Sequence, residues 1–287
     1  MAPKTKTESV EDKYKKFTQL EHVIARPGMY IGEIATVTSE QWILNKDNKI
    51  INKFVKWNPG IYKIFDEIIT NASDECQRNK NVKKIEVDFN TTNNSISVLN
   101  EGSGIPIQIH KEHNIYVPEL IFGNLLSSSN YDDSKKRTTG GLNGLGAKLT
   151  NIYSVEFKVE TVYSGEKYVQ IFKNNMSEIG KPEISKTKEK DYTRITFIPD
   201  YSKFKLTKLD QYDTLDVLKK RVFDISAITP KHVSVFLNGE KLKCKDFSEY
   251  INYYIGTKTE SPRVYYEEPN GRWQIGIALS QKDSFQH

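Results

Sequence analysis

The glycine-rich segment from Gly140 to Lys148 constrains this chain more than any other stretch of its sequence. Glycines at 141, 144 and 146 let the backbone approach a ligand closely, and the residues that follow predict a helix running to about Tyr153. The free N–H groups and the positive dipole end of such a helix favour an anion, and Lys148 adds a charge. We interpret the segment as a phosphate cradle, with a flexible turn between core elements as the alternative.

Two common phosphate-binding patterns do not fit this segment. A Walker A loop, G-x-x-x-x-G-K-[ST], would need lysine at position 147, which is alanine, and G-x-G-x-x-G fails because Leu149 occupies its last glycine position. The segment must therefore be judged on its mechanics rather than on a motif.

A second informative feature lies about seventy residues earlier. Apolar residues at 61, 64, 65, 68, 69, 72 and 76 predict an amphipathic helix that begins after Asn58-Pro59-Gly60. Its apolar face includes Cys76, which we expect to be a small core residue. Glu67 and Asn71 share the polar face: a carboxylate there could deprotonate a water that attacks a phosphoryl group, and an amide oxygen suits Mg²⁺. The alternative is an ordinary polar helix face.

The remaining periodicities predict the fold class. We expect strands at 85–89, 95–98, 155–163, 167–173, 192–198, from 233 and at 273–279, and helices at 117–126, 213–227 and 246–255. We expect residues 1–16 to form a flexible arm, residues 26–32 to form a tight turn, and residues 127–139 to form a loop long enough to act as a lid. Helices and mainly antiparallel strands are partly segregated, which favours an α+β fold with a sheet that has one helical face.

Composition excludes several classes of protein. Of the 287 residues, 37% are hydrophobic and 28% charged, which is typical of a soluble globular chain, and no apolar run approaches the roughly 20 residues that span a bilayer. The N-terminus has no apolar signal region, and two cysteines form neither a disulfide framework nor a zinc site. A net charge of +5 is compatible with a nucleic-acid partner without requiring one.

Two further groups of polar residues are candidates for ligand binding. Asn100 lies between a predicted strand and Gly102 and Gly104, so its amide could read the edge of a base; the alternative is a turn asparagine. Ser128, Ser129 and Asn130 could bind a ribose or phosphates, or could keep a loop soluble.

In their order and spacing, these segments resemble the N-terminal ATPase region of type IIA DNA topoisomerases, members of the gyrase, Hsp90, histidine kinase and MutL ATPase superfamily. The eukaryotic type is the most similar. The resemblance covers essentially all residues after about 14. The matching segments are Gln19–Gly32, Phe65–Asp74, Asn100–Pro106, Tyr116–Asp133, Thr139–Lys148, Asp191–Phe197 and Phe236–Gly239. Gln19–Gly32 and Tyr116–Asp133 argue against a chaperone-type or mismatch-repair member of the superfamily.

The resemblance implies a Bergerat-type two-layer α/β sandwich that binds ATP with Mg²⁺. It implies that Glu67 is the general base, that Asn71 is the Mg²⁺ ligand, and that Asn100, with Thr193, lies near the adenine. Ser128, Ser129 and Asn130 would hold ribose and phosphate. The triphosphate would be wrapped by Gly141, Leu142, Asn143, Gly144, Leu145, Gly146, Ala147 and Lys148. In the family, ATP binding dimerises two such domains and closes a gate around a DNA duplex.

The same resemblance predicts three regions: an arm over 1–25 that wraps the partner subunit, an ATPase domain over 26–243, and the beginning of a transducer domain over 244–287. The family's transducer lysine and its DNA-cleavage residues are not in this sequence, so an ATP-dependent dimerisation module with negligible hydrolysis is the alternative. We expect the rest of a topoisomerase chain as a partner and no membrane. The resemblance implies the nucleus, or the cytoplasm for a viral or bacterial-like source.

Two departures from the family pattern bear on the site. Leu142 and Leu145 stand where eukaryotic relatives usually carry arginine and tyrosine, which predicts weaker nucleotide binding. Arg26–Gly32 looks more bacterial than eukaryotic.

Overall fold

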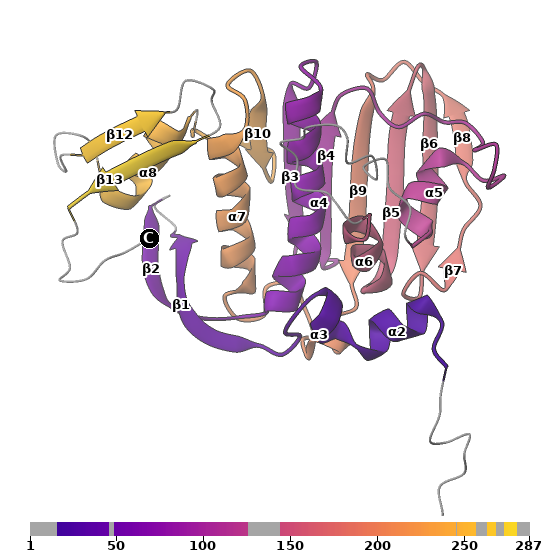
Figure 1. Ribbon diagram of the computed structural model, residues 1–287, viewed down its shortest axis with the longest axis horizontal. Coiled ribbons are helices and arrows are strands. Elements are labelled where there is room, and N and C mark those ends of the chain that lie inside the picture. The colour runs from indigo at the N-terminus through magenta and orange to yellow at the C-terminus, as the bar shows by residue number, and fades with distance from the viewer. Residues whose placement is uncertain are drawn as a thin grey trace, which may run out of the picture.

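A nine-stranded, mainly antiparallel sheet with helices on one face organises the described part of the chain (Figure 1). The computed structural model describes residues 16–45, 49–125, 144–244, 246–256, 263–267 and 273–279. The strands of the sheet are β3 (Lys84–Asn90), β4 (Ser95–Glu101), β5 (Ser154–Tyr163), β6 (Glu166–Lys173), β7 (Glu178–Ile179), β8 (Glu183–Lys186), β9 (Tyr192–Pro199), β10 (Ser234–Leu237) and β11 (Glu240–Lys241).

The strand order is β11-β10-β3-β4-β9-β5-β6-β7, and β8 also pairs with β6. Among the described strands, β10 and β3 form the one parallel pair, and the other pairs are antiparallel. The predicted α+β class with a mixed, mainly antiparallel sheet is therefore confirmed.

Helices pack on the face of this sheet that is turned to the viewer in Figure 1. They are α4 (Pro59–Arg78), α5 (Val117–Gly123), α6 (Gly146–Ile152) and α7 (Thr214–Ile228). In α4, the side-chain oxygen of Asn58 accepts a hydrogen bond from the Ile61 N–H at 3.0 Å, and Pro59 occupies the first turn. Arg221 Nε of α7 donates to Asp66 Oδ1 of α4 at 2.6 Å, which joins the two helices.

The predicted apolar stripe of α4 is the centre of the core. Every one of its seven positions is buried, and they pack with Ile85 and Val87 of β3 and with Ile96 and Val98 of β4. Cys76, 2% exposed, is the expected core residue, and burial raises the pKa of its thiol to about 12. Burying this stripe orients the helix, so its polar residues lie along the sides that the sheet does not cover.

Two short helices precede the sheet, and the second of them occupies most of residues 26–32, where a tight turn was predicted. They are α2 (Gln19–Ala25) and α3 (Pro27–Tyr30). The turn prediction was wrong for Pro27–Tyr30, because proline at the first position favours a helical turn. Tyr153 OH donates to the Val23 carbonyl at 2.7 Å, which fastens α2 to the end of α6.

The remaining elements lie at the other end of the molecule (Figure 1). They are a hairpin of β1 (Val37–Leu44) and β2 (Ile50–Trp57), α8 (Phe247–Ile255), and a second hairpin of β12 (Arg263–Glu267) and β13 (Gln274–Ala278). The 3₁₀ turn η1 (Tyr201–Phe204) follows β9, and Phe204 packs against Tyr153 at the end of α6. The β1–β2 hairpin was not predicted from the sequence of residues 37–57. None of the described helices is both long and apolar enough to cross a membrane.

Candidate nucleotide-binding site

The structure brings the Glu67 carboxylate of α4 against the start of α6. A β-carbon built on Gly146 would lie 1.9 Å from Glu67 Oε2 and 3.2 Å from the Glu67 β-carbon, so the approach requires a glycine. The two helices are joined by Thr150 Oγ1, which donates to the Ile64 carbonyl at 2.8 Å. The carboxylate on the predicted amphipathic helix thus meets the glycine-rich segment.

Glu67 is held from its own helix as well. Its Oε1 forms a salt bridge with Lys63 Nζ one turn earlier, and its side chain is 25% exposed, so water can reach the carboxylate. Asn71, one turn further along α4, is exposed. An oriented carboxylate and an amide therefore lie one turn apart on a solvent-accessible side of α4.

Lys148 lies in the first turn of α6 and is only 4% exposed. Burial disfavours its charged ammonium group and lowers its pKa to about 8. A phosphate beside this side chain would favour the charged form. Gly144 has a φ of +60°, a backbone conformation that suits glycine, and Leu145 precedes α6, where Ala147 is buried.

A row of polar residues crosses three strands at one end of the sheet. Asn100 of β4 pairs with Thr193 of β9, and Thr193 pairs with Thr161 of β5. Paired residues of an antiparallel sheet point to the same face, and in each strand this position continues the row of apolar residues under the helices. Thr161 Oγ1 accepts from the Ile105 N–H at 2.9 Å, donates to the Tyr192 carbonyl at 2.9 Å, and lies 3.4 Å from Thr193 Oγ1.

The turn after β4 fixes this row relative to α4. Gly104 has a φ of +64°, and a β-carbon there would lie 2.0 Å from the Val162 carbonyl oxygen. Asn79 Nδ2, just beyond α4, donates to Glu75 Oε1 at 3.2 Å and to Ser103 Oγ at 2.8 Å. The row with Asn100 therefore lies towards the C-terminal end of α4, whereas Glu67 lies in its middle.

Six predicted site residues lie outside the described residues: Ser128, Ser129, Asn130, Gly141, Leu142 and Asn143. Leu125 and Leu145, which flank the segment that contains these residues in the sequence, help to line a pocket of about 540 Å³. Its lining residues are Phe17, Thr18, Gln19, His22, Val23, Tyr30, Leu125 and Leu145. The start of the chain thus meets both flanks of the segment that contains the six residues.

Two residues of the candidate site, Thr161 and Lys63, were not predicted from the sequence. Thr161 is a polar residue at an inward position of β5, where Phe157 and Val159 precede it on the same face. That break in an alternating pattern is a signal that could have found it. Lys63 stands four residues before Glu67 in a predicted helix, a spacing that places the two charges together.

This geometry, a carboxylate on one helix meeting a glycine at the start of another above a mainly antiparallel sheet, agrees with a family match. Residues 58–203 match the family described as histidine kinase-, DNA gyrase B-, and HSP90-like ATPase. The match covers α4, α6, the Asn100 row and the central strands of the sheet. The chain belongs to this ATPase family.

The most informative relatives within the family are DNA topoisomerases II. The chain is 44% identical to DNA topoisomerase 2 of Arabidopsis thaliana over 95% of this chain and 19% of that protein. It is 43% identical to DNA topoisomerase 2 of Saccharomyces cerevisiae over 96% of this chain and 20% of that protein. The chain therefore spans about a fifth of the length of these relatives.

Solved structures give the same result for the fold. The ATPase region of Saccharomyces cerevisiae topoisomerase II matches with a TM-score of 0.89 and 44% identity, over 95% of this chain and 72% of that one. The ATPase and transducer domains of DNA topoisomerase II from Balamuthia mandrillaris match with a TM-score of 0.91 and 41% identity, over 97% and 71% of the two chains. The resemblance inferred from the sequence is confirmed.

Proposed function

We propose that this chain binds ATP with Mg²⁺ and hydrolyses it to ADP and phosphate, as the nucleotide-operated clamp of a type II topoisomerase. The observation that carries the proposal is the contact between the Glu67 carboxylate and Gly146, where the glycine-rich segment enters α6. A triphosphate wrapped by residues 141–148 would end beside a carboxylate that water can reach.

Glu67 acts as the general base in this proposal. Its carboxylate takes a proton from a water molecule while the water oxygen attacks the γ-phosphorus in line. The bond from the γ-phosphorus to the β–γ bridging oxygen breaks, and ADP leaves with that oxygen. The salt bridge from Lys63 and the close packing of Gly146 hold the carboxylate in one orientation.

Asn71 is the proposed Mg²⁺ ligand. Its exposed amide lies one turn from Glu67, and oxygen donors with room for several waters are what Mg²⁺ requires, so the residues present fit the ion. When bound, the ion neutralises charge on the phosphates. The triphosphate would adjoin the glycine-rich segment, which consists of Gly141, Leu142, Asn143, Gly144, Leu145, Gly146, Ala147 and Lys148.

The other end of the nucleotide is assigned to the polar row. We propose that Asn100 and Thr193 bind the adenine, because their side chains lie on the helix-covered face towards the C-terminal end of α4, away from Glu67. Ser128, Ser129 and Asn130 are proposed to hold ribose and phosphate.

Dimerisation and DNA capture extend the proposal beyond the nucleotide. Similarity to the ATPase region of topoisomerase II supports two copies closing around a DNA duplex once ATP binds, with the rest of a topoisomerase chain as the partner. A net charge of +5 is compatible with that ligand. The resemblance to eukaryotic topoisomerases II supports the nucleus as the compartment of the protein, or the cytoplasm for a viral or bacterial-like source.

Equilibrium binding of a non-hydrolysable ATP analogue with Mg²⁺, with molar mass read by light scattering in the same run, tests this proposal. We expect saturable binding and a shift from monomer to dimer. Asn100→Ala should weaken the affinity about tenfold through a lost base contact, whereas Gly28→Ala, on α3, should not change it. Absence of saturable binding would contradict the nucleotide site, and binding without a change of mass would contradict the clamp.

A further inference from the structure

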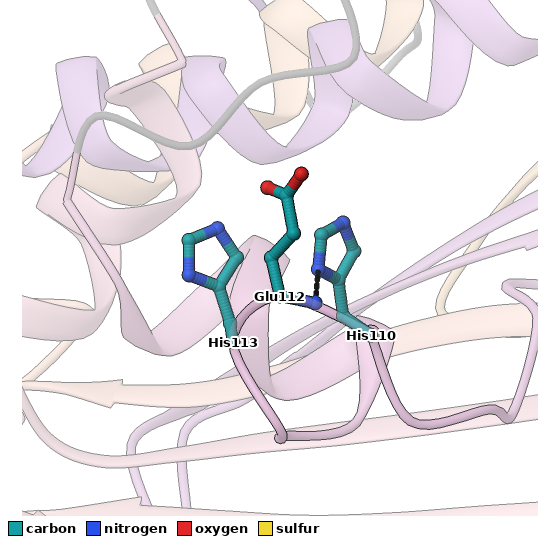
Figure 2. Close-up of side chains that lie close together, drawn as sticks. All are labelled: His110, Glu112 and His113. Atoms are coloured by element: carbon teal, nitrogen blue, oxygen red, sulfur yellow. Dashed lines mark hydrogen bonds between the residues drawn. The ribbon is translucent and has the colours of Figure 1, made fainter.

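Three potential metal ligands gather in the turn between the Asn100–Gly104 segment and α5. His110, Glu112 and His113 each offer one ligand atom, and these atoms all lie within 4.8 Å of one another. Figure 2 shows the Glu112 carboxylate rising between the two imidazole rings, with all three side chains on the same side of the turn. Nothing in the proposed ATP chemistry uses these residues.

The backbone of this turn is held at both ends. Ile109 and Tyr116 form an isolated antiparallel bridge, and the His110 N–H donates to the Ile115 carbonyl at 2.8 Å. The Asn114 N–H donates to the His110 carbonyl at 2.8 Å, and Asn114 has a φ of +54°, which asparagine tolerates better than most residues. The turn therefore presents the three side chains together without a ligand to gather them.

The two imidazoles already face each other. Their ring centroids are 4.9 Å apart with an interplanar angle of 25°. His110 Nδ1 accepts a long hydrogen bond of 3.3 Å from the Glu112 N–H. Binding a cation would exchange this weak contact for a metal bond at Nδ1, or at Nε2 once the proton moves to Nδ1.

We infer that His110, Glu112 and His113 form a binding site for a first-row transition-metal ion such as Zn²⁺. Two imidazoles and one carboxylate suit Zn²⁺, whereas Mg²⁺ takes oxygen ligands and water. Ligand atoms about 2 Å from a shared ion must come closer together than 4.8 Å, and Glu112 and His113 are exposed side chains that can rotate to do so. Three protein ligands leave the fourth position to water.

The site lies in the segment that connects β4, which carries Asn100, with α5. The turn follows Gly104 and leads directly into α5, since the Val117 N–H donates to the Gln108 carbonyl at 2.9 Å. A bound ion would stiffen this connection and would stabilise the folded chain by mass action.

Calorimetric titration of the untagged 287-residue chain with Zn²⁺, without nucleotide, tests the inference. We expect one equivalent of Zn²⁺ to bind and to raise the melting temperature of the chain. Co²⁺, used as a spectroscopic probe, should also bind as one equivalent and give visible absorption. Replacing both histidines, His110→Asn with His113→Asn, should weaken the affinity about 100-fold or more. His232→Asn, which removes an exposed histidine elsewhere, should leave the affinity unchanged.

The inference is overturned if the wild-type chain takes up no Zn²⁺, or if the double variant binds it as tightly as the wild type. A melting curve of the double variant without metal that matches the wild type rules out misfolding as the cause of lost binding. Because no nucleotide is present, the result is independent of whether the chain binds ATP.

Discussion

Replacing Gly146 by alanine should slow ATP hydrolysis while leaving the fold intact. The new methyl carbon would lie 1.9 Å from Glu67 Oε2, whereas ordinary contacts begin at 3.4 Å, so the carboxylate oxygen must move by about 1.5 Å. The carboxylate oxygen is the far end of a flexible side chain, whereas the Glu67 β-carbon, at 3.2 Å, must give way by only a few tenths of an ångström, so the cost to folding is small. Alanine is also the better helix former, by up to about 1 kcal/mol.

The expected size of the effect follows from that displacement. A misplacement of about 1 Å in a reacting group can cost about 100-fold in rate, which corresponds to about 2.7 kcal/mol in the activation free energy. We therefore expect kcat for Gly146→Ala to fall about 100-fold while the free energy of unfolding stays equal to that of the wild type or rises slightly.

Steady-state ATP turnover and urea unfolding, measured on the same preparations, check both parts of this prediction. Gly28→Ala is the matched control, because it makes the same change within α3, where a β-carbon would meet nothing within 4 Å. Wild-type turnover by Gly146→Ala would refute the claim that Glu67 works from the position in which Gly146 holds it. A large loss of stability would refute the claim that the side chain of Glu67 takes up most of the displacement.

Three further predictions concern residues around the candidate nucleotide site. Burial lowers the pKa of Lys148 from 10.5 to about 8, so between these pH values the unfolded chain binds more protons than the folded chain. The stability of the wild type relative to Lys148→Met should therefore rise as the pH rises from 8 to 10.5. At pH 7 without nucleotide, urea unfolding should show the variant to be the more stable by up to about 3 kcal/mol, but the variant should bind the ATP analogue less tightly. Thr161→Val leaves the Ile105 N–H without its acceptor and should cost about 1–3 kcal/mol in the same assay; an unchanged unfolding midpoint would contradict that account. Gly104→Ala would place alanine at a positive φ and its β-carbon against the Val162 carbonyl oxygen. It should lower the free energy of unfolding by at least about 2 kcal/mol, and the melting temperature should fall accordingly.

Local periodicity was enough to predict most of the fold. The apolar stripe of α4 is buried at every expected position, because a helix that packs on a sheet must turn one continuous face inward. The alternation in β3, β4, β5 and β9 likewise identified strands with one face under the helices. The first hairpin, β1–β2, was not predicted, because apolar and polar residues do not alternate along its two strands, whose sequences are VTSEQWIL and IINKFVKW.

The site was predictable as a set of residues but not as an arrangement. Spacing within one helix places Glu67 beside Asn71 and could have placed Lys63. The contact between Glu67 and Gly146 depends instead on how α4 and α6 pack, and the pairing of Asn100, Thr193 and Thr161 depends on the register of three strands that are distant in sequence. Neither arrangement leaves a local pattern in the sequence.

The central claim, that Glu67 is the general base of an ATP site, is tested most directly by ATP turnover of Glu67→Gln together with its affinity for a non-hydrolysable analogue. Glutamine keeps the shape of the side chain and cannot take the proton. The account predicts that turnover falls by about 100-fold or more while the analogue binds as tightly as it does to the wild type. Hydrolysis at the wild-type rate by Glu67→Gln would contradict the account.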